Sequence, residues 1–154
     1  MSKGYKRILV PLDGSKAAEK ALPDTIALAG MSGAEITLFR VLPFMRDVIE
    51  TGDGPIYVDE QWDIRKAQAE RYLKAIAERP ECKQIKMSTV VETGPVAETI
   101  MEYALKNNID IIVMATHGRT GFKRWSFGSV AEKVVRGADR PVLLVRAHSD
   151  AGGK

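Results

Sequence analysis

The chain has 154 residues, of which 45% are hydrophobic and 28% charged, and it carries a formal net charge of +3. This size and composition predict one compact globular domain with a substantial core. Acidic and basic residues alternate along most of the chain instead of forming a block, so we expect neither a nucleic acid nor a membrane as a partner.

The N-terminal apolar run, residues 8–12, ends at Asp13 and is too short for a signal peptide or a membrane span. A single cysteine, Cys82, excludes an internal disulfide framework and is expected to be a surface or helix-end thiol. We therefore expect a cytoplasmic protein with one domain over residues 1–147 and a frayed polar tail over 148–154.

The first buried strand is expected over residues 8–12, followed by a turn in which Ser15 caps a helix. Pro23 lies inside this helical pattern and should kink or split it. The second strand is predicted over 35–42, and Pro43 ends it because proline cannot donate to a sheet ladder.

Residues 44–58 show no sustained period and contain Gly52-Asp53-Gly54-Pro55, which predicts a long mobile loop that serves as a lid or partner surface. A helical pattern returns over 59–79. The third strand is expected over 85–92, and a third helix begins at Gly94-Pro95 and ends at Asn107-Asn108.

The fourth strand passes through residues 111–114 and is followed by a loop that contains three glycines and several cations. A helical period begins after Gly128-Ser129, with Gly137 as a stop signal. The last strand is expected over 140–145.

Strands that alternate with helices predict a five-stranded parallel sheet with helices on both faces, Rossmann-like, with strand order 3-2-1-4-5. In such sheets ligands bind beyond the carboxyl ends of the strands, where the strand order reverses. We expect Asp13 and the loop after Ala115 on either side of that crevice.

The candidate residues each have a functional and a structural interpretation. Asp13 is placed to accept ribose hydroxyls or to help hold a metal bound to phosphates, or it is a turn and capping residue. Gly128-Ser129 offers a phosphate its N–H groups and a hydroxyl, or it is an ordinary helix start. The cationic side chains after His117 form either a phosphate-binding surface or a solvated face. We assign no catalytic role to His117 itself.

Other site classes are excluded by their missing patterns. The sequence contains no Gly-x-x-x-x-Gly-Lys-Ser/Thr phosphate loop and no Gly-x-Gly-x-x-Gly after the first strand. Its two histidines and one cysteine have no paired spacing, so a structural zinc site is not expected.

Four motifs together resemble the universal stress protein family, and the resemblance covers nearly the whole chain. The ATP-binding branch of that family has glycine, two residues, glycine, nine residues, then glycine and serine or threonine. Here Gly118 and Gly128-Ser129 fit the second part, whereas the first glycine falls on Ala115. The motifs are Val10-Pro11-Leu12-Asp13-Gly14-Ser15, Met114-Ala115-Thr116-His117-Gly118-Arg119-Thr120-Gly121, Phe127-Gly128-Ser129-Val130-Ala131-Glu132 and Arg140-Pro141-Val142-Leu143-Leu144-Val145.

The resemblance implies an ATP site, with Mg²⁺, and a homodimer that pairs the last strand, Val142 to Val145, across a two-fold axis. By resemblance, Asp13 would take the ribose. The adenine would be surrounded by Pro11, Leu12, Val41 and Met114, and the phosphates would be held by Ala115, Gly118, Gly128, Ser129 and Val130.

Three functions follow as hypotheses. The leading one is a homodimeric, ATP-binding regulator of a stress response that engages a protein partner and is not a fast enzyme. The second is a slow ATP hydrolase or phosphoryl-transfer protein at the same site. The third is a nucleotide-free protein-interaction module, with Ala115 as the mark of the lost nucleotide.

Overall fold

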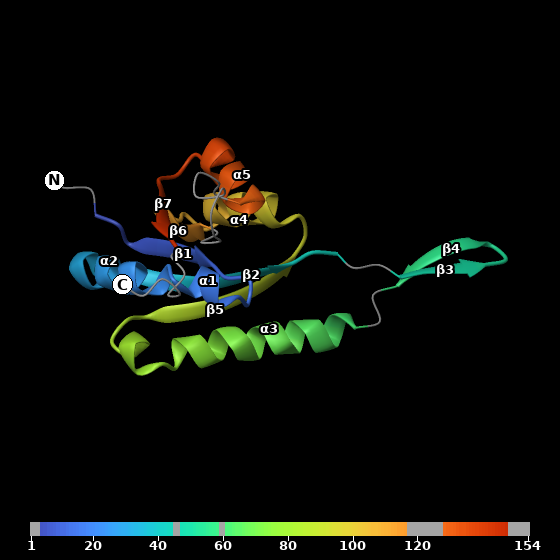
Figure 1. Cartoon of the computed structure of the whole chain (residues 1–154), viewed down its shortest axis with the longest axis horizontal. Coiled ribbons are helices and arrows are strands. Elements are labelled where there is room, and N and C mark those ends of the chain that lie inside the picture. Colours follow the sequence, from blue (N-terminus) through green and yellow to red (C-terminus); the bar gives the residue numbers. More distant parts are fainter. Residues whose placement is uncertain (1–3, 45–46, 59–60, 117–127, 148–154) are drawn as a thin grey trace, which may run out of the picture.

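The computed structural model describes residues 4–44, 47–58, 61–116 and 128–147. Five parallel strands form one sheet in the order β5-β2-β1-β6-β7 (Figure 1). Counted without the separate β3 and β4, this is the order 3-2-1-4-5 that the sequence predicts, so the expected Rossmann-like fold is confirmed. The strands are β1 (Arg7–Pro11), β2 (Glu35–Leu42), β5 (Met87–Thr93), β6 (Ile111–Thr116) and β7 (Val142–Arg146).

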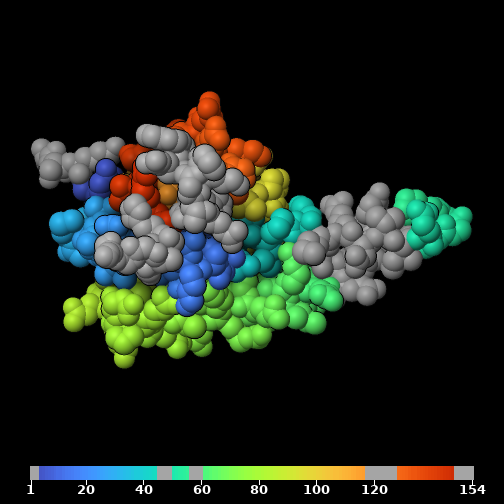
Figure 2. Space-filling view, in the orientation of Figure 1, coloured from blue at the N-terminus to red at the C-terminus, as the bar shows by residue number. Residues whose placement is uncertain are grey.

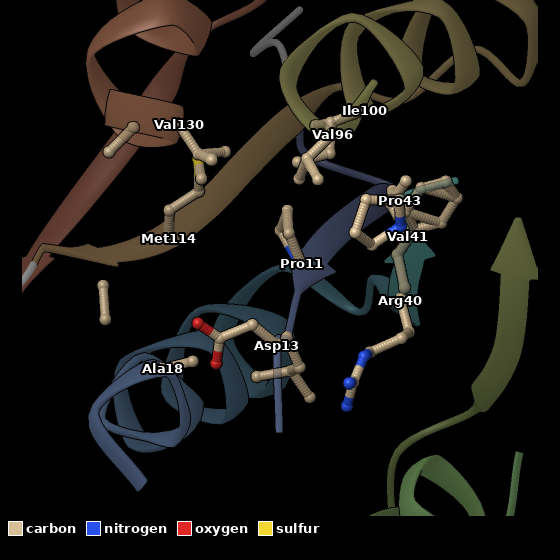
Figure 3. A pocket seen from close by; sticks show the side chains of 14 residues that line it. Pro11, Asp13, Ala18, Arg40, Val41, Pro43, Val96, Ile100, Met114 and Val130 are labelled. Atoms are coloured by element: carbon tan, nitrogen blue, oxygen red, sulfur yellow. The ribbon is translucent and has the colours of Figure 1, made fainter. Parts of the chain in front are cut away.

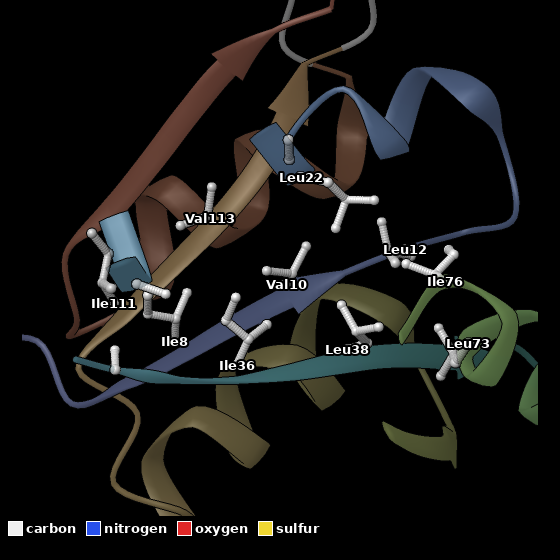
Figure 4. Close-up of a cluster of buried hydrophobic side chains, with 13 residues drawn as sticks. Ile8, Val10, Leu12, Leu22, Ile36, Leu38, Leu73, Ile76, Ile111 and Val113 are labelled. Atoms are coloured by element: carbon white, nitrogen blue, oxygen red, sulfur yellow. The ribbon is translucent and has the colours of Figure 1, made fainter. Parts of the chain in front are cut away.

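Helices cover both faces of the sheet, because successive strand residues point to opposite sides. Ile8 and Val10 face one cluster, to which α2 and α3 contribute (Figure 4). Leu9, between them, faces a second cluster to which α4 and α5 contribute. The helices are α1 (Lys16–Glu19), α2 (Leu22–Ser32), α3 (Trp62–Ala77), α4 (Val96–Lys106) and α5 (Ser129–Gly137).

The first helical region is split in two just before Pro23, at Lys20 and Ala21, and the sequence predicts such a split. Pro23 lies in the first turn of α2, where its missing N–H removes no helical hydrogen bond. Ser15 is the N-cap of α1 and its side chain accepts a hydrogen bond from the Ala18 N–H. The chain therefore turns back sharply after β1 and brings α1 close to the strand end.

The prediction of an irregular loop over 44–58 is wrong. Its described part is an antiparallel hairpin of β3 (Asp47–Thr51) and β4 (Gly54–Val58), which projects from the body of sheet and helices (Figures 1 and 2). Thr51 pairs with Gly54 across a two-residue turn, and Gly54 has φ of +114°, which favours glycine. Strands of five residues are too short to show a sustained alternation.

The remaining helices begin and end near their expected positions. Pro80 follows α3 and begins a short 3-10 helix, η1 (Pro80–Cys82). Of the two expected positions for Cys82, the helix end is confirmed and the surface is not, because Cys82 ends η1 and is buried. Burial, followed by the Glu81 charge, raises the pKa of its thiol. Within the described ranges, no helix is both long and apolar enough to span a membrane. The tail 148–154 lies outside them.

Candidate functional site

A pocket of about 290 Å³ lies at the carboxyl ends of β1, β2 and β6, beside the point where the strand order reverses (Figure 3). This is where the sequence predicts a ligand site. Helices α1, α4 and α5 complete its walls. Its lining residues are Pro11, Leu12, Asp13, Ala18, Phe39, Arg40, Val41, Pro43, Val96, Ile100, Met114, Ala115, Val130 and Ala131.

Most of the predicted site residues meet in this pocket, although their binding roles stay predictions. Gly128 and Ser129 are not part of the lining. They lie at the start of α5, and the next residue of its first turn, Val130, does line the pocket. Gly118 lies outside the described residues, as do His117, Gly121 and the nearby cations. The predicted residues that line the pocket are Pro11, Leu12, Asp13, Val41, Met114, Ala115 and Val130.

The wall formed by the strand ends is apolar and well ordered by packing. Leu12, Val41 and Met114 are 3%, 8% and 6% exposed and belong to the hydrophobic core. The Leu12 N–H donates to the carbonyl of Phe39 at 2.8 Å, which extends the pairing of β1 with β2 beyond β1 itself. A pocket with apolar walls and few polar groups suits a flat heteroaromatic ring.

Asp13 is a turn residue, as its structural interpretation predicts, and it also lines the pocket. Its Oδ1 accepts hydrogen bonds from the Ser15 N–H at 2.9 Å and the Ser15 hydroxyl at 2.6 Å. Among the described residues, no donor is bonded to Oδ2. One carboxylate oxygen therefore shapes the turn into α1, and the other is placed to accept a hydrogen bond from a ligand.

The N-terminus of α5 differs from an ordinary helix start, in which a side chain such as that of serine caps the helix. Gly128 is the N-cap, with φ of +82°, and among the described residues no side chain caps the helix; Ser129 is the first helical residue. The first-turn N–H groups carry a partial positive charge that attracts anions. Because Val130 and Ala131 line the pocket, this positive end is directed at it.

Arg40 is a lining residue that the sequence interpretation missed. An added Cβ on Gly14, whose φ is +89°, would lie 2.6 Å from Arg40 Nη1, so the guanidinium packs closely against this glycine. The guanidinium carbon also lies 5.8 Å from the centre of the Tyr72 ring, a cation–π distance. A useful signal was present: Arg40 is a charged residue between the apolar Phe39 and Val41 near a strand end.

A polar network ties α1 to α3 beneath the site. The carboxylate of Glu19, whose side chain is 9% exposed, accepts hydrogen bonds from the Tyr72 hydroxyl at 2.8 Å and from Arg79 Nη2 at 2.7 Å. Burial alone would raise the pKa of Glu19, but the bonds from Arg79 and Tyr72 outweigh it and hold that pKa below its usual value. Burial, followed by the bond to Glu19, raises the pKa of Tyr72.

Replacing Glu19 with glutamine is expected to reduce the free energy of unfolding by about 1–3 kcal/mol near neutral pH, because a charge-assisted pair is lost. The Glu19 pKa is lower in the folded state, so its contribution is present above about pH 4.3 and is lost as the pH falls through the folded value. Urea titrations of both proteins should thus converge at acidic pH. Glu70→Gln, which breaks only an exposed pair with Lys66, is the control; equal neutral-pH stability of Glu19→Gln and wild type would contradict the argument.

The family model described as the universal stress protein family matches residues 4–146. A universal stress protein of Methanocaldococcus jannaschii is 33% identical over 146 residues, covering 92% of this chain and 82% of the relative. The family match spans the pocket and the whole sheet.

Solved structures show the same fold. A universal stress protein family member from Burkholderia pseudomallei has a TM-score of 0.71 at 26% identity, covering 94% of this chain and 98% of that one. A universal stress protein from Archaeoglobus fulgidus, solved in complex with dAMP, has a TM-score of 0.62 at 18% identity and covers 92% of this chain and 98% of its own.

Proposed function

This chain belongs to the universal stress protein family, and from that premise we propose that its pocket binds an adenine nucleotide, ATP in the first instance. The observation that carries the proposal is one pocket that joins an apolar slot, a carboxylate and the first turn of a helix. These are the surroundings that a base, a ribose and a phosphate chain require. The protein then acts as a nucleotide-dependent regulator of a stress response in the reducing cytoplasm.

In this proposal the adenine lies against the strand ends, where backbone groups of Pro11, Leu12, Val41 and Met114 surround it. The ribose reaches Asp13 Oδ2. The phosphates point toward Ala115 and the first turn of α5, at Gly128, Ser129 and Val130, with Gly118 as the further proposed phosphate residue. The dAMP complex of the Archaeoglobus fulgidus relative supports an adenine nucleotide as the ligand class to test.

Mg²⁺ is proposed to arrive with the phosphates. Within the described part of the chain, no group of three or more His, Cys, Asp or Glu side chains is placed to hold a metal ion. Asp13 is the carboxylate in the described pocket lining, so the phosphate oxygens of the nucleotide would supply most of the anionic ligands that Mg²⁺ prefers.

Calorimetric titration of the purified protein with ATP and with GTP tests this function. Saturable ATP binding that exceeds GTP binding is the expected result, and absence of any adenine nucleotide binding would overturn the proposal in favour of an interaction module. Single-turnover measurement of bound ATP separates a regulator from a slow hydrolase. We expect bound ATP to persist, because the described lining offers one carboxylate and no histidine to position a water.

We also propose that two copies pair along β7. This strand lies at one end of the sheet order, and its Leu143 side chain is 39% exposed. An apolar edge strand favours pairing with another chain, and a two-fold axis would make the contact self-complementary. A protein that responds to the nucleotide state of this dimer is the further partner we propose.

Replacing Leu143 with lysine is expected to shift the dimer toward monomer by at least about tenfold in dissociation constant, because a charge must then be buried at the two-fold axis. Light scattering after size-exclusion chromatography measures the change. Leu105→Lys is the matched control, since Leu105 is also an exposed leucine but belongs to α4 and not to β7. A wild-type protein that is monomeric at all concentrations would contradict the proposed pairing.

A further inference from the structure

A second hollow, of about 640 Å³, adjoins the nucleotide pocket on the side of α3. The two share Asp13, Arg40 and Pro43 in their linings, so they meet at the carboxyl ends of β1 and β2. Arg65 and Tyr72 of α3 form the far wall of the hollow. A group that leaves the nucleotide pocket beside Asp13 would therefore enter this second space.

Arg40 is fixed in place between the two spaces. Its guanidinium packs against Gly14 on one side and lies near the Tyr72 ring on the other. Tyr72 is itself held by its bond to Glu19. Among the described residues, Arg40 forms no ion pair and no hydrogen bond, so a preorganised guanidinium lacks an anionic partner there.

Among its described lining residues, the hollow has two arginines and one carboxylate. Arg65 lines it and donates from Nη2 to the Pro43 carbonyl at 2.9 Å, which holds this second guanidinium at the junction of the two spaces. Opposing the two cations is Asp13, whose Oδ1 already accepts two hydrogen bonds from Ser15. A planar guanidinium fork matches the oxygens of a phosphate group.

The position of the hollow relative to α5 indicates which phosphate group of a nucleotide the hollow would bind. Val130 and Met114 lie on one side of Pro11 in the pocket, and Arg40 extends from the opposite side (Figure 3). A 5′-phosphate directed at the α5 N-terminus therefore points away from Arg40. The ribose edge, held through Asp13 Oδ2, is the part of the nucleotide that faces the hollow.

Resting on the proposed function, we propose that this hollow is an anion subsite for a phosphate carried on the 2′ or 3′ oxygen of the ribose. Asp13 Oδ2 accepts a hydrogen bond from the remaining ribose hydroxyl, and Arg40, with Arg65 beside it, binds the added phosphate. The preferred ligand class is then an adenosine bisphosphate, with one phosphate on each side of the ribose.

Calorimetry with 5′-AMP, adenosine 2′,5′-bisphosphate and adenosine 3′,5′-bisphosphate tests the subsite. Wild-type protein is expected to bind one bisphosphate at least about tenfold more tightly than 5′-AMP, as one charge-assisted contact predicts. In Arg40→Gln the ratio of the two dissociation constants should fall to about two or less. Using the ratio removes any general effect of the substitution on the pocket.

Two further variants and one control make the result specific. Arg40→Lys keeps the charge without the fork and should give an intermediate ratio. Arg65→Gln should reduce the ratio as well, whereas Arg71→Gln, on an exposed position of α3, should leave it unchanged. Thermal unfolding confirms that each variant is folded.

The outcomes separate this inference from the proposed function. If no adenine nucleotide binds, the proposed function fails and the subsite with it. If 5′-AMP and ATP bind but neither bisphosphate binds more tightly than 5′-AMP, only the subsite is overturned. An unchanged bisphosphate preference in Arg40→Gln would equally overturn it, because the added phosphate would then have another partner.

Discussion

Replacing Val130 with aspartate is expected to weaken ATP binding by at least about a hundredfold while the protein stays folded. Val130 lies in the first turn of α5 and lines the pocket, so the new carboxylate would occupy the position proposed for the phosphates. The same carboxylate is favourable for the helix, because the N-terminal dipole stabilises an acid in the first turn. Calorimetry measures the affinity and thermal unfolding measures the stability.

Val130→Asn is the matched control, since asparagine has nearly the same shape as aspartate and no charge. It should lose much less affinity than the aspartate variant if repulsion of phosphate is the cause. Equal losses in both variants would indicate a steric effect and would contradict the placement of the phosphates at α5. Retained ATP affinity in Val130→Asp would contradict it more directly.

The sheet was predictable from the sequence because β1, β6 and β7 each contain a short apolar run, which is typical of a buried strand. Residues 8–10 and 111–114 are buried in the structure, and burial on both faces of the sheet explains the continuous apolar pattern. Alternation of strands with helices then leaves few topologies to consider. The hairpin β3–β4 was missed because its five-residue strands show no sustained alternation, although Gly52-Asp53 is a recognised two-residue hairpin signal.

The site was predictable to the extent that it follows the ends of the strands. Asp13, Val41 and Met114 meet because parallel strands present their carboxyl ends at one edge. Arg40 was missed because its position depends on contacts with Gly14 and Tyr72, which are distant from it in sequence. Likewise, the sequence indicated Gly128-Ser129 as a helix start, but only the backbone angles show that Gly128 is the N-cap and Ser129 the first helical residue.

Replacing Phe39 with alanine is expected to lower the free energy of unfolding by about 3–5 kcal/mol, which corresponds to a fall in Tm of roughly 6–20 °C. Phe39 is fully buried in β2, and its ring centre lies 4.6 Å from that of Tyr103. Truncation would leave a cavity between the sheet and α4. Differential scanning calorimetry and urea titration measure the loss.

The same substitution is expected to weaken nucleotide binding, because Phe39 joins the core to the site. Its side chain lines the pocket, and its carbonyl accepts the Leu12 N–H beside Asp13. Phe39→Leu refills most of the cavity and should lose less than about 1.5 kcal/mol. Saturating ATP should raise the Tm of Phe39→Ala less than that of wild type, since ligand stabilisation follows affinity. Equal ATP-induced shifts in both proteins would show that the pocket does not depend on this part of the core.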